Sequence, residues 1–577
     1  MSGFPDWQVA VETSQVLAGL VKYPAGNPFF IYHVKLWTIL HQILAPFLAL
    51  GVSEIRLSLI VSGVLGMVTF QALSMVVYAL SRDAWLAIGS SVFIFFTRTA
   101  EYGGVYGLFL LGTENTYGIL GMSFCLLAVA MIGAGSYRAG AFLLALAPAV
   151  HPSLGVWTGA IVACALLFDV RTLRGELRPA WRWFFIGCLV TLASLAVQLA
   201  FIYRAPHATS LSGVSGTSGA GGGFSVDELT AFIKFWDGHR RPVDIANDGV
   251  KLNFAALAMA AAWLLAFKDH LPRPSLFLLR FVAVSAALSL AMMCVSWIPP
   301  ERLPAMLLVM MPGRLMNFDA LVYAVMLIGL LGAYRRLWSQ ILTLLLAAGF
   351  FVSEQSMLWG WLRDSRHIDV FSTVKPLWIM AGVSLSLVAG AASKRFREPF
   401  SSSWNEKGSR NLFTLRYLTL AITLAAAVLT LSFSRPRSLI FRDRTNDVFF
   451  GQVAAGKGVL ATAGDLHLIQ LKTRRPVLLD GGGLDGVMYS LEAGPEMKRI
   501  LREVYGVDLL NPPEEARGAG RIPPLATQKV WEGYSAEKWR ELGRSFHVTQ
   551  VLTYPDWTLQ LPLAAQSRRY LLYQIPE

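Results

Sequence analysis

LSLIVSGVLGMVTFQALSMVVYAL, residues 57–80, contains no charged side chain. It is long enough to cross the hydrocarbon core of a membrane as a helix, which takes about 20 apolar residues. The whole chain of 577 residues has the same character, with 54% hydrophobic and 15% charged residues and a mean hydropathy of +0.50. This composition excludes an ordinary cytosolic enzyme.

Similar apolar runs recur along the chain and stop near Phe433. They predict a polytopic α-helical membrane protein with about a dozen transmembrane helices. Runs such as 139–150 are shorter than a perpendicular span and must be extended, broken or buried among neighbours. The expected spans are 57–80, 84–97, 117–135, 139–150, 153–169, 183–203, 252–267, 281–297, 319–334, 338–353, 376–391 and 417–433.

Basic residues sort the connecting loops into two alternating sets. The formal net charge is +13, which in a membrane chain indicates topology signals and contact with anionic lipid rather than nucleic acid. Basic residues collect on the cytoplasmic side, which is where we place the loops with Arg82, Arg138, 171–182, 268–280, Arg335 and Arg336, and 394–416. The opposite, extracytoplasmic set is 98–116, the turn at His151, 204–251, 298–318, 354–375 and the tail from Ser434.

The same alternation places residues 1–56 outside, although no apolar span precedes them. We therefore expect a first transmembrane helix upstream of Phe4. The apolar run 33–50 carries His33, Lys35, His41 and Gln42, which is typical of a helix lying along the interface.

Residues 434–577 are expected to form an extracytoplasmic α/β domain. Strands are predicted at 458–462, 476–480, 548–554 and 570–575, and helices at 492–505 and 536–546. The domain has no cysteine, and the four cysteines of the chain lie in apolar runs, where they are expected to be buried hydrophobes.

Candidate catalytic residues are carboxylates of the expected external face. Asp6, at the start of an amphipathic stretch, is a candidate general base or a helix cap. Glu101 and Glu114 lie among glycines and aromatics, which favours a ligand cavity, although solvation explains a lone loop Glu equally simply. His151, beside Pro152, is a candidate ligand-binding residue or a satisfied interfacial histidine.

Candidate phosphate-binding residues lie in two other external loops. FIKFWDGHRRP places Lys234, His239, Arg240 and Arg241 beside aromatic rings, which suits a phosphate or a stacked sugar as well as headgroup anchoring. PPERLPAMLLVMMPGRLMNF, 299–318, predicts a broken helix, and such breaks usually line a cavity. Its Arg314 is a candidate phosphate ligand, with snorkelling as the alternative.

These features resemble the C-type membrane glycosyltransferases, the GT-C fold, whose members transfer sugars from polyprenyl-linked donors outside the cytoplasm. Asp6 resembles the acidic residue of their first external loop, YHVKLW with His33 and Lys35 resembles their interface helix, and Glu101, with Glu114 as rival, resembles the second carboxylate. RRPVLLDGG and FHVTQVLTY are similar to their tails.

The resemblance implies a bacterial inner-membrane enzyme with a polyprenyl-phosphate sugar donor and a glycan, lipid or protein acceptor. Asp6 would deprotonate or orient the acceptor hydroxyl, with inversion at the anomeric carbon. Lys35, Arg240, Arg241 and Arg314 would stabilise the phosphate charge. Members differ in their use of a divalent cation, so the resemblance leaves this requirement open.

Two other function classes remain compatible with the sequence. A transporter or lipid-linked saccharide flippase would also have many helices, although inverted repeats and midspan charges are not evident. A non-catalytic protein of envelope polysaccharide assembly is the other alternative.

Overall fold

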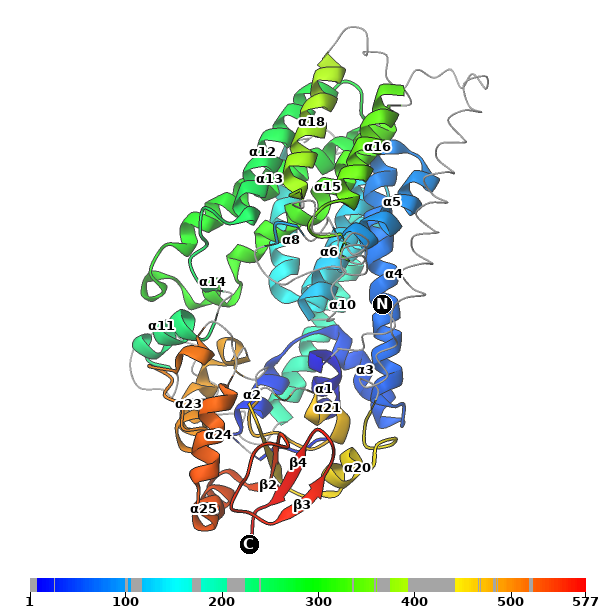
Figure 1. The fold of residues 1–577 in the computed structure, drawn as a ribbon. Coiled ribbons are helices and arrows are strands. Elements are labelled where there is room, and N and C mark those ends of the chain that lie inside the picture. Colours follow the sequence, from blue (N-terminus) through cyan, green and yellow to red (C-terminus); the bar gives the residue numbers. More distant parts are fainter. Residues whose placement is uncertain are drawn as a thin grey trace.

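The computed structural model describes residues 8–24, 26–98, 102–104, 117–168, 178–204, 224–237, 240–334, 337–356, 360, 374–392, 442–464, 466, 468–480, 484, 486–517 and 522–577. Within these residues, long apolar helices form one part of the molecule and a mixed α/β region forms the other (Figure 1). Helices α1 (Gln8–Leu17), α2 (Pro28–Lys35) and α3 (Ile39–Ala49) lie where the two parts meet.

Every predicted span except 417–433, which lies outside the described residues, coincides with a helix. The helices are α4 (Glu54–Ser81), α5 (Ala84–Thr97), α6 (Tyr117–Gly133), α7 (Tyr137–Val150), α8 (Pro152–Leu167), α10 (Trp181–Arg204), α12 (Asp248–Phe267), α13 (Arg273–Ser296), α15 (Met316–Ala333), α16 (Leu337–Phe351) and α18 (Pro376–Ala392). Among the described residues, five segments are long and apolar enough to cross a membrane: Glu54–Ser81, Trp181–Tyr203, Asp248–Phe267, Arg273–Ser296 and Met306–Ala333.

Two predicted starts were wrong. Helix α13 begins at Arg273 rather than 281, so Arg273 and Arg280 belong to the helix and not to a loop. Both cations lie in the first turns of this mostly apolar helix, so their long side chains can reach water at the end of the helix. Helix α12 begins at Asp248 rather than 252, since the side chain of Asn247 accepts a hydrogen bond from Gly249 N at 2.7 Å and caps the helix.

Within the described residues, the loops after α4 and α6 and the start of α13 lie together at one end of the helical part. Arg82 Nη1 donates to the carbonyl of Ala134 at 3.3 Å, which joins the loops after α4 and α6. Ser275 Oγ donates to the carbonyl of Ala79 at 2.6 Å and brings the start of α13 to the same place. These described members of the basic set therefore lie side by side.

Helix α15 is the centre of the helical part. Residues 316–331 are all buried, and a Cβ added at Gly329 would come within 3.0 Å of Leu80 on α4. The surrounding apolar side chains of α4, α12 and α13 form one continuous core with it.

The interface helix predicted at 33–50 is two helices instead of one. Residues 36–38 are not helical, and Thr38 caps α3 by accepting from Leu40 N at 3.2 Å while His41 Nε2 accepts from Thr38 N at 3.1 Å. This capping box restarts the helix in a new direction. Ile43, Phe47 and Leu50 are exposed, which leaves α3 with an outward apolar face.

Residues 442–577 contain a four-stranded mixed sheet with the order β1-β2-β4-β3. The strands are β1 (Val459–Thr462), β2 (Val548–Thr553), β3 (Leu563–Gln566) and β4 (Leu571–Gln574); β1 and β2 are parallel and the other pairs antiparallel. Three predicted strands coincide with β1, β2 and β4. The strand predicted at 476–480 is reduced to one isolated bridge between Val477 and Leu460.

Helices surround this sheet. They are α20 (Val448–Ala455), α21 (Ile469–Thr473), α23 (Gly494–Glu503), α24 (Pro524–Gly533) and α25 (Ala536–Phe546). The last matches the predicted 536–546, and α23 with the short turn Leu491–Ala493 fills most of 492–505. Their buried faces share an apolar core with the strands.

A buried ionic cluster joins the two parts. Glu54, at the start of α4, accepts from Arg474 Nε at 2.6 Å, Arg444 Nη2 at 3.3 Å and Gln15 Nε2 at 3.1 Å. Gln470 Nε2 donates to the carbonyl of Glu12 at 3.1 Å, so α21 also packs on α1.

Candidate functional site

Arg314 lies where the helical part faces the C-terminal region. The segment that carries it is broken, as predicted, into a 3-10 turn (Pro300–Arg302), α14 (Ala305–Val309) and a second 3-10 turn (Pro312–Leu315). Met311, between the last two, has a φ of 45°, a backbone conformation that an unbranched side chain adopts at some cost. The break gives Arg314 a place at the end of the apolar helices and not within one.

Two neutral groups face the guanidinium of Arg314. Its Nη1 lies 3.5 Å from His151 Nε2 and its Nη2 lies 3.5 Å from Tyr489 Oη. Burial, reinforced by Arg314, holds the pKa of His151 well below its usual range, so His151 is neutral. Among the described residues no carboxylate pairs with Arg314, whose Nε is buried without a hydrogen-bond partner.

His151 is held in place from three sides. It is the residue between α7 and α8, and its Nδ1 accepts from Leu154 N at 3.4 Å. Its ring stacks on Tyr117 with a centroid distance of 4.7 Å. Gly121 on α6 leaves room for it, since a Cβ there would lie 2.5 Å from His151 Cβ.

Arg240 approaches Tyr489 from another loop. Its guanidinium carbon lies 5.5 Å from the centre of the Tyr489 ring, and its Nε donates to the carbonyl of Leu308 at 2.8 Å. An ion pair with the buried Asp237 neutralises it. Arg241 Nη2 donates to the carbonyl of Phe235 at 3.4 Å, while its Nε is buried and unpartnered.

His33 and Lys35 extend the same area from α2. His33 is buried, with its Nδ1 2.8 Å from Thr13 Oγ1 on α1, and burial lowers its pKa to about 3. Lys35 forms an ion pair with Glu492 of the C-terminal region. Tyr32, the residue before His33, places its ring 6.4 Å from that of Tyr489. Helices α1 and α2 are thereby linked to the Arg314 neighbourhood.

Asp6, Glu101, Glu114 and His239 lie outside the described residues. Of the candidates that are described, Arg240 and Arg314 both contact Tyr489, and His151 lies beside Arg314. Four residues of this neighbourhood could not be identified from the sequence: Tyr489, Tyr117, Asp237 and Glu492. An aromatic residue or a single acid in a long polar region does not reveal from the local sequence which residue it contacts.

Beside Arg240 and Arg241, a small cavity of about 90 Å³ is lined mainly by apolar residues that include Trp297, Leu308 and Met311. Cationic groups next to an apolar surface suit an amphiphile with an anionic head. The described residues include no group of three or more His, Cys, Asp or Glu side chains that could hold a metal ion.

No family model matches the chain, and no curated protein matches it. The crystal structure of ArnT from Cupriavidus metallidurans bound to undecaprenyl phosphate shares 12% identity over 99% of this chain and 93% of that one, with a TM-score of 0.40. The apo structure of ArnT shares 13% identity over 99% and 92%, with a TM-score of 0.31. Both of these neighbours are structures of ArnT. At these values the likeness supports no conclusion about this chain, whose chemistry follows from its own residues.

Proposed function

We propose that this protein is a membrane glycosyltransferase that moves a sugar from a polyprenyl-phosphate donor to an extracytoplasmic acceptor. The observation that carries the proposal is Arg314, a cation with two neutral neighbours and no described carboxylate partner, at the end of an apolar helical bundle. A guanidinium in this position favours a phosphate, to which it donates two parallel hydrogen bonds.

The surroundings of Arg314 suit an amphiphilic donor. We place part of the prenyl chain in the apolar cavity beside Arg240 and Arg241, whose lining includes Gly313, and the phosphate at the adjacent Arg314. Undecaprenyl phosphate, the lipid in the ArnT structure, is a carrier of this kind. Lys35 and Arg240 already pair with Glu492 and Asp237, so we assign the main charge compensation to Arg314 and a supporting part to Arg241.

In the proposed reaction an acceptor hydroxyl attacks the anomeric carbon of the sugar as the bond from that carbon to the phosphate oxygen breaks. Asp6 takes the hydroxyl proton, and the polyprenyl phosphate leaves with the bonding electron pair. Arg314 stabilises the charge that grows on the phosphate. Asp6 precedes α1, which is tied to the site through Thr13, His33 and Tyr32. Glu101 and Glu114 are the alternative bases.

The test compares Arg314→Gln with Arg302→Gln in proteoliposomes supplied with a panel of radiolabelled polyprenyl-phosphate sugars. Arg302 lies in the same broken segment, is exposed and carries the same charge. We expect Arg314→Gln to weaken donor binding at least about tenfold, as loss of a charged hydrogen-bond partner requires, and Arg302→Gln to have little effect. Equal binding by both variants would refute the phosphate role of Arg314.

Asp6→Asn separates binding from chemistry. We expect it to bind donor normally and to lose transfer, because it removes only the base. Undiminished transfer would move the assignment to Glu101 or Glu114. Donor binding without cleavage by the wild-type chain, across the whole panel, would instead favour the transporter.

A further inference from the structure

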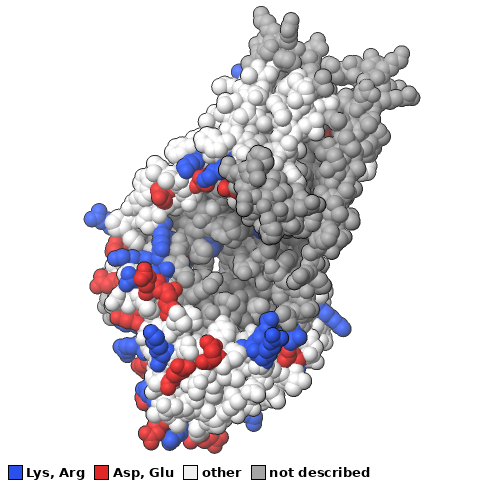
Figure 2. All heavy atoms as spheres, viewed as in Figure 1, with Lys and Arg blue, Asp and Glu red and all other residues white. Residues whose placement is uncertain are grey.

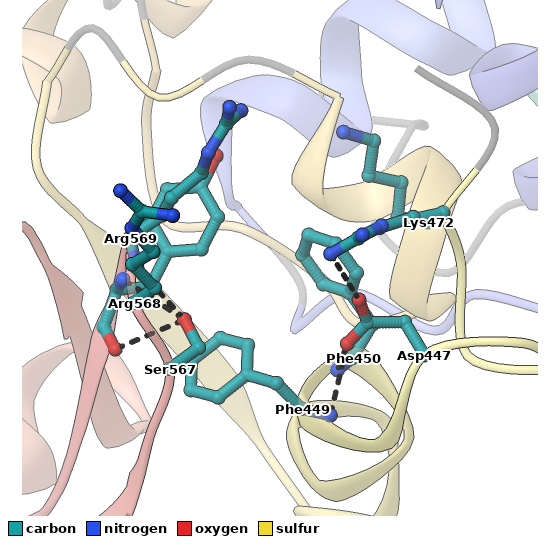
Figure 3. Close-up of a pocket in the computed structure, with 9 residues that line it drawn as sticks. Asp447, Phe449, Phe450, Lys472, Ser567, Arg568 and Arg569 are labelled. Carbon is teal, nitrogen blue, oxygen red and sulfur yellow. Dashed lines mark hydrogen bonds and ion pairs between the residues drawn. The ribbon is translucent and has the colours of Figure 1, made fainter. Parts of the chain in front are cut away.

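A second pocket lies in the C-terminal region, away from Arg314. Its volume of about 560 Å³ is in the range of pockets that hold small ligands. It is lined by Arg442, Asp447, Phe449, Phe450, Lys472, Ser567, Arg568, Arg569 and Tyr570. Figure 2 shows the basic side chains gathered over α21, and Figure 3 shows the walls of the pocket.

The charges of the pocket do not balance. Four basic side chains face one carboxylate, Asp447. Asp447 is already engaged, because its Oδ1 caps α20 by accepting from Phe449 N at 2.9 Å and its Oδ2 lies 3.6 Å from Arg442 Nη1. Among the described residues neither Arg568 nor Arg569 has an acidic partner, so the pocket attracts anions.

The position of the two arginines is fixed by the turn between β3 and β4. Ser567 N donates to the carbonyl of Tyr570 at 2.8 Å, and Ser567 Oγ accepts from Tyr570 N at 3.0 Å. The turn therefore presents Arg568 and Arg569 on one wall, opposite Lys472 and Asp447 (Figure 3).

Aromatic rings form the remaining surface. The rings of Phe449 and Tyr570 stack at a centroid distance of 5.9 Å, and Lys472 Nζ lies 5.1 Å from the centre of the Phe450 ring. Ring faces beside cations suit a ligand that has both an apolar face and negative charge, which is the chemistry of a sugar that bears phosphate.

From this combination we propose that the pocket between α20, α21 and the β3–β4 turn binds a phosphorylated saccharide. The adjoining Arg444 and Arg474 pair with Glu54 at the first residue of α4, so the pocket adjoins the end of a membrane-length helix. The phosphorylated saccharide can therefore come from a lipid headgroup or from a free molecule. The proposal is independent of the transferase activity, since it concerns binding at a separate pocket.

The test measures binding of two probes to the purified full chain by isothermal titration calorimetry. Glucose 1,6-bisphosphate represents the free source, nanodiscs with phosphatidylinositol 4-phosphate represent the lipid source, and maltose is the neutral control. We expect at least one phosphorylated probe to bind and maltose not to bind. Binding of the nanodiscs alone assigns the lipid source, binding of glucose 1,6-bisphosphate alone assigns the free source, and binding of neither phosphorylated probe refutes the proposal.

Substitutions test whether the phosphorylated probe binds in the pocket. We expect the double change R568A/R569A to weaken binding at least about tenfold, and R568K/R569K to retain most of it. R502A/R544A is the matched control, because it removes the same charge from exposed positions on α23 and α25 outside the pocket. A thermal unfolding curve verifies that each variant is folded. Equal weakening by both alanine pairs would show an unspecific charge effect and overturn the proposal.

Discussion

Replacing Glu54 by Gln tests how the helical part and the C-terminal region are joined. The Glu54 side chain is 2% exposed, and its partners Arg444 and Arg474 are 18% and 25% exposed. The change removes the negative charge and leaves both guanidinium groups without their counterion. The hydrogen bond from Gln15 can persist, so the charge is the main quantity that changes.

The expected loss of stability follows from the burial of Glu54 and its two arginine partners. Breaking a fully buried ion pair costs about 3–5 kcal/mol. Both arginines reach water, which reduces the cost here to about 2–4 kcal/mol of stability for the C-terminal region. Glu503→Gln is the control, because Glu503 pairs with Arg502 at 3.3 Å on the surface, where side-chain exposures are 35% and 66%. We expect that change to cost less than about 1 kcal/mol.

Pulse proteolysis of the purified protein over a guanidinium series measures both effects, since new cleavage reports unfolding of the C-terminal region. The expected result is a clearly lower midpoint for Glu54→Gln and an unchanged one for Glu503→Gln. Equal midpoints for Glu54→Gln and wild type would show that the buried ion pairs of Glu54 do not stabilise the junction.

Two further predictions concern the site. Gly121→Ala should displace His151, whose Cβ would lie 2.5 Å from the new methyl group. We expect it to lower the stability of the fold by about 1–3 kcal/mol and to weaken donor binding. The control is Gly159→Ala on α8, where a Cβ would have nothing within 4 Å; it should change neither quantity in the same thermal and binding assays. The pKa of His33 is about 3 in the folded protein against 6.5 in the unfolded chain. Between these pH values the folded protein keeps His33 neutral, whereas the unfolded chain takes up a proton. The stability of the folded protein should therefore fall as pH drops from 6.5 toward 3, by about 2 kcal/mol at pH 5. His33→Gln should remove this contribution, so that the unfolding temperature falls less on acidification. An unchanged dependence of the unfolding temperature on pH would contradict the low pKa of His33.

The long helices could be predicted because an uninterrupted apolar run is a local property, as in α4 and α10. Helix starts were less predictable, since Arg273 and Arg280 resembled loop residues until the structure placed them in α13. Strand β3 was missed because LAAQ is largely exposed and lacks the alternation of a half-buried strand. The ion pair of Lys35 with Glu492 joins residues far apart in the chain, so no local sequence pattern predicts it.

The proposed reaction breaks the bond between a sugar and a polyprenyl phosphate. The most direct measurement supplies the wild-type protein in proteoliposomes with a radiolabelled polyprenyl-phosphate sugar and follows both the chemical state of the label and its side of the membrane. We expect release of polyprenyl phosphate and a transferred sugar with inverted anomeric configuration. Movement of the intact labelled lipid across the membrane without bond cleavage would contradict it.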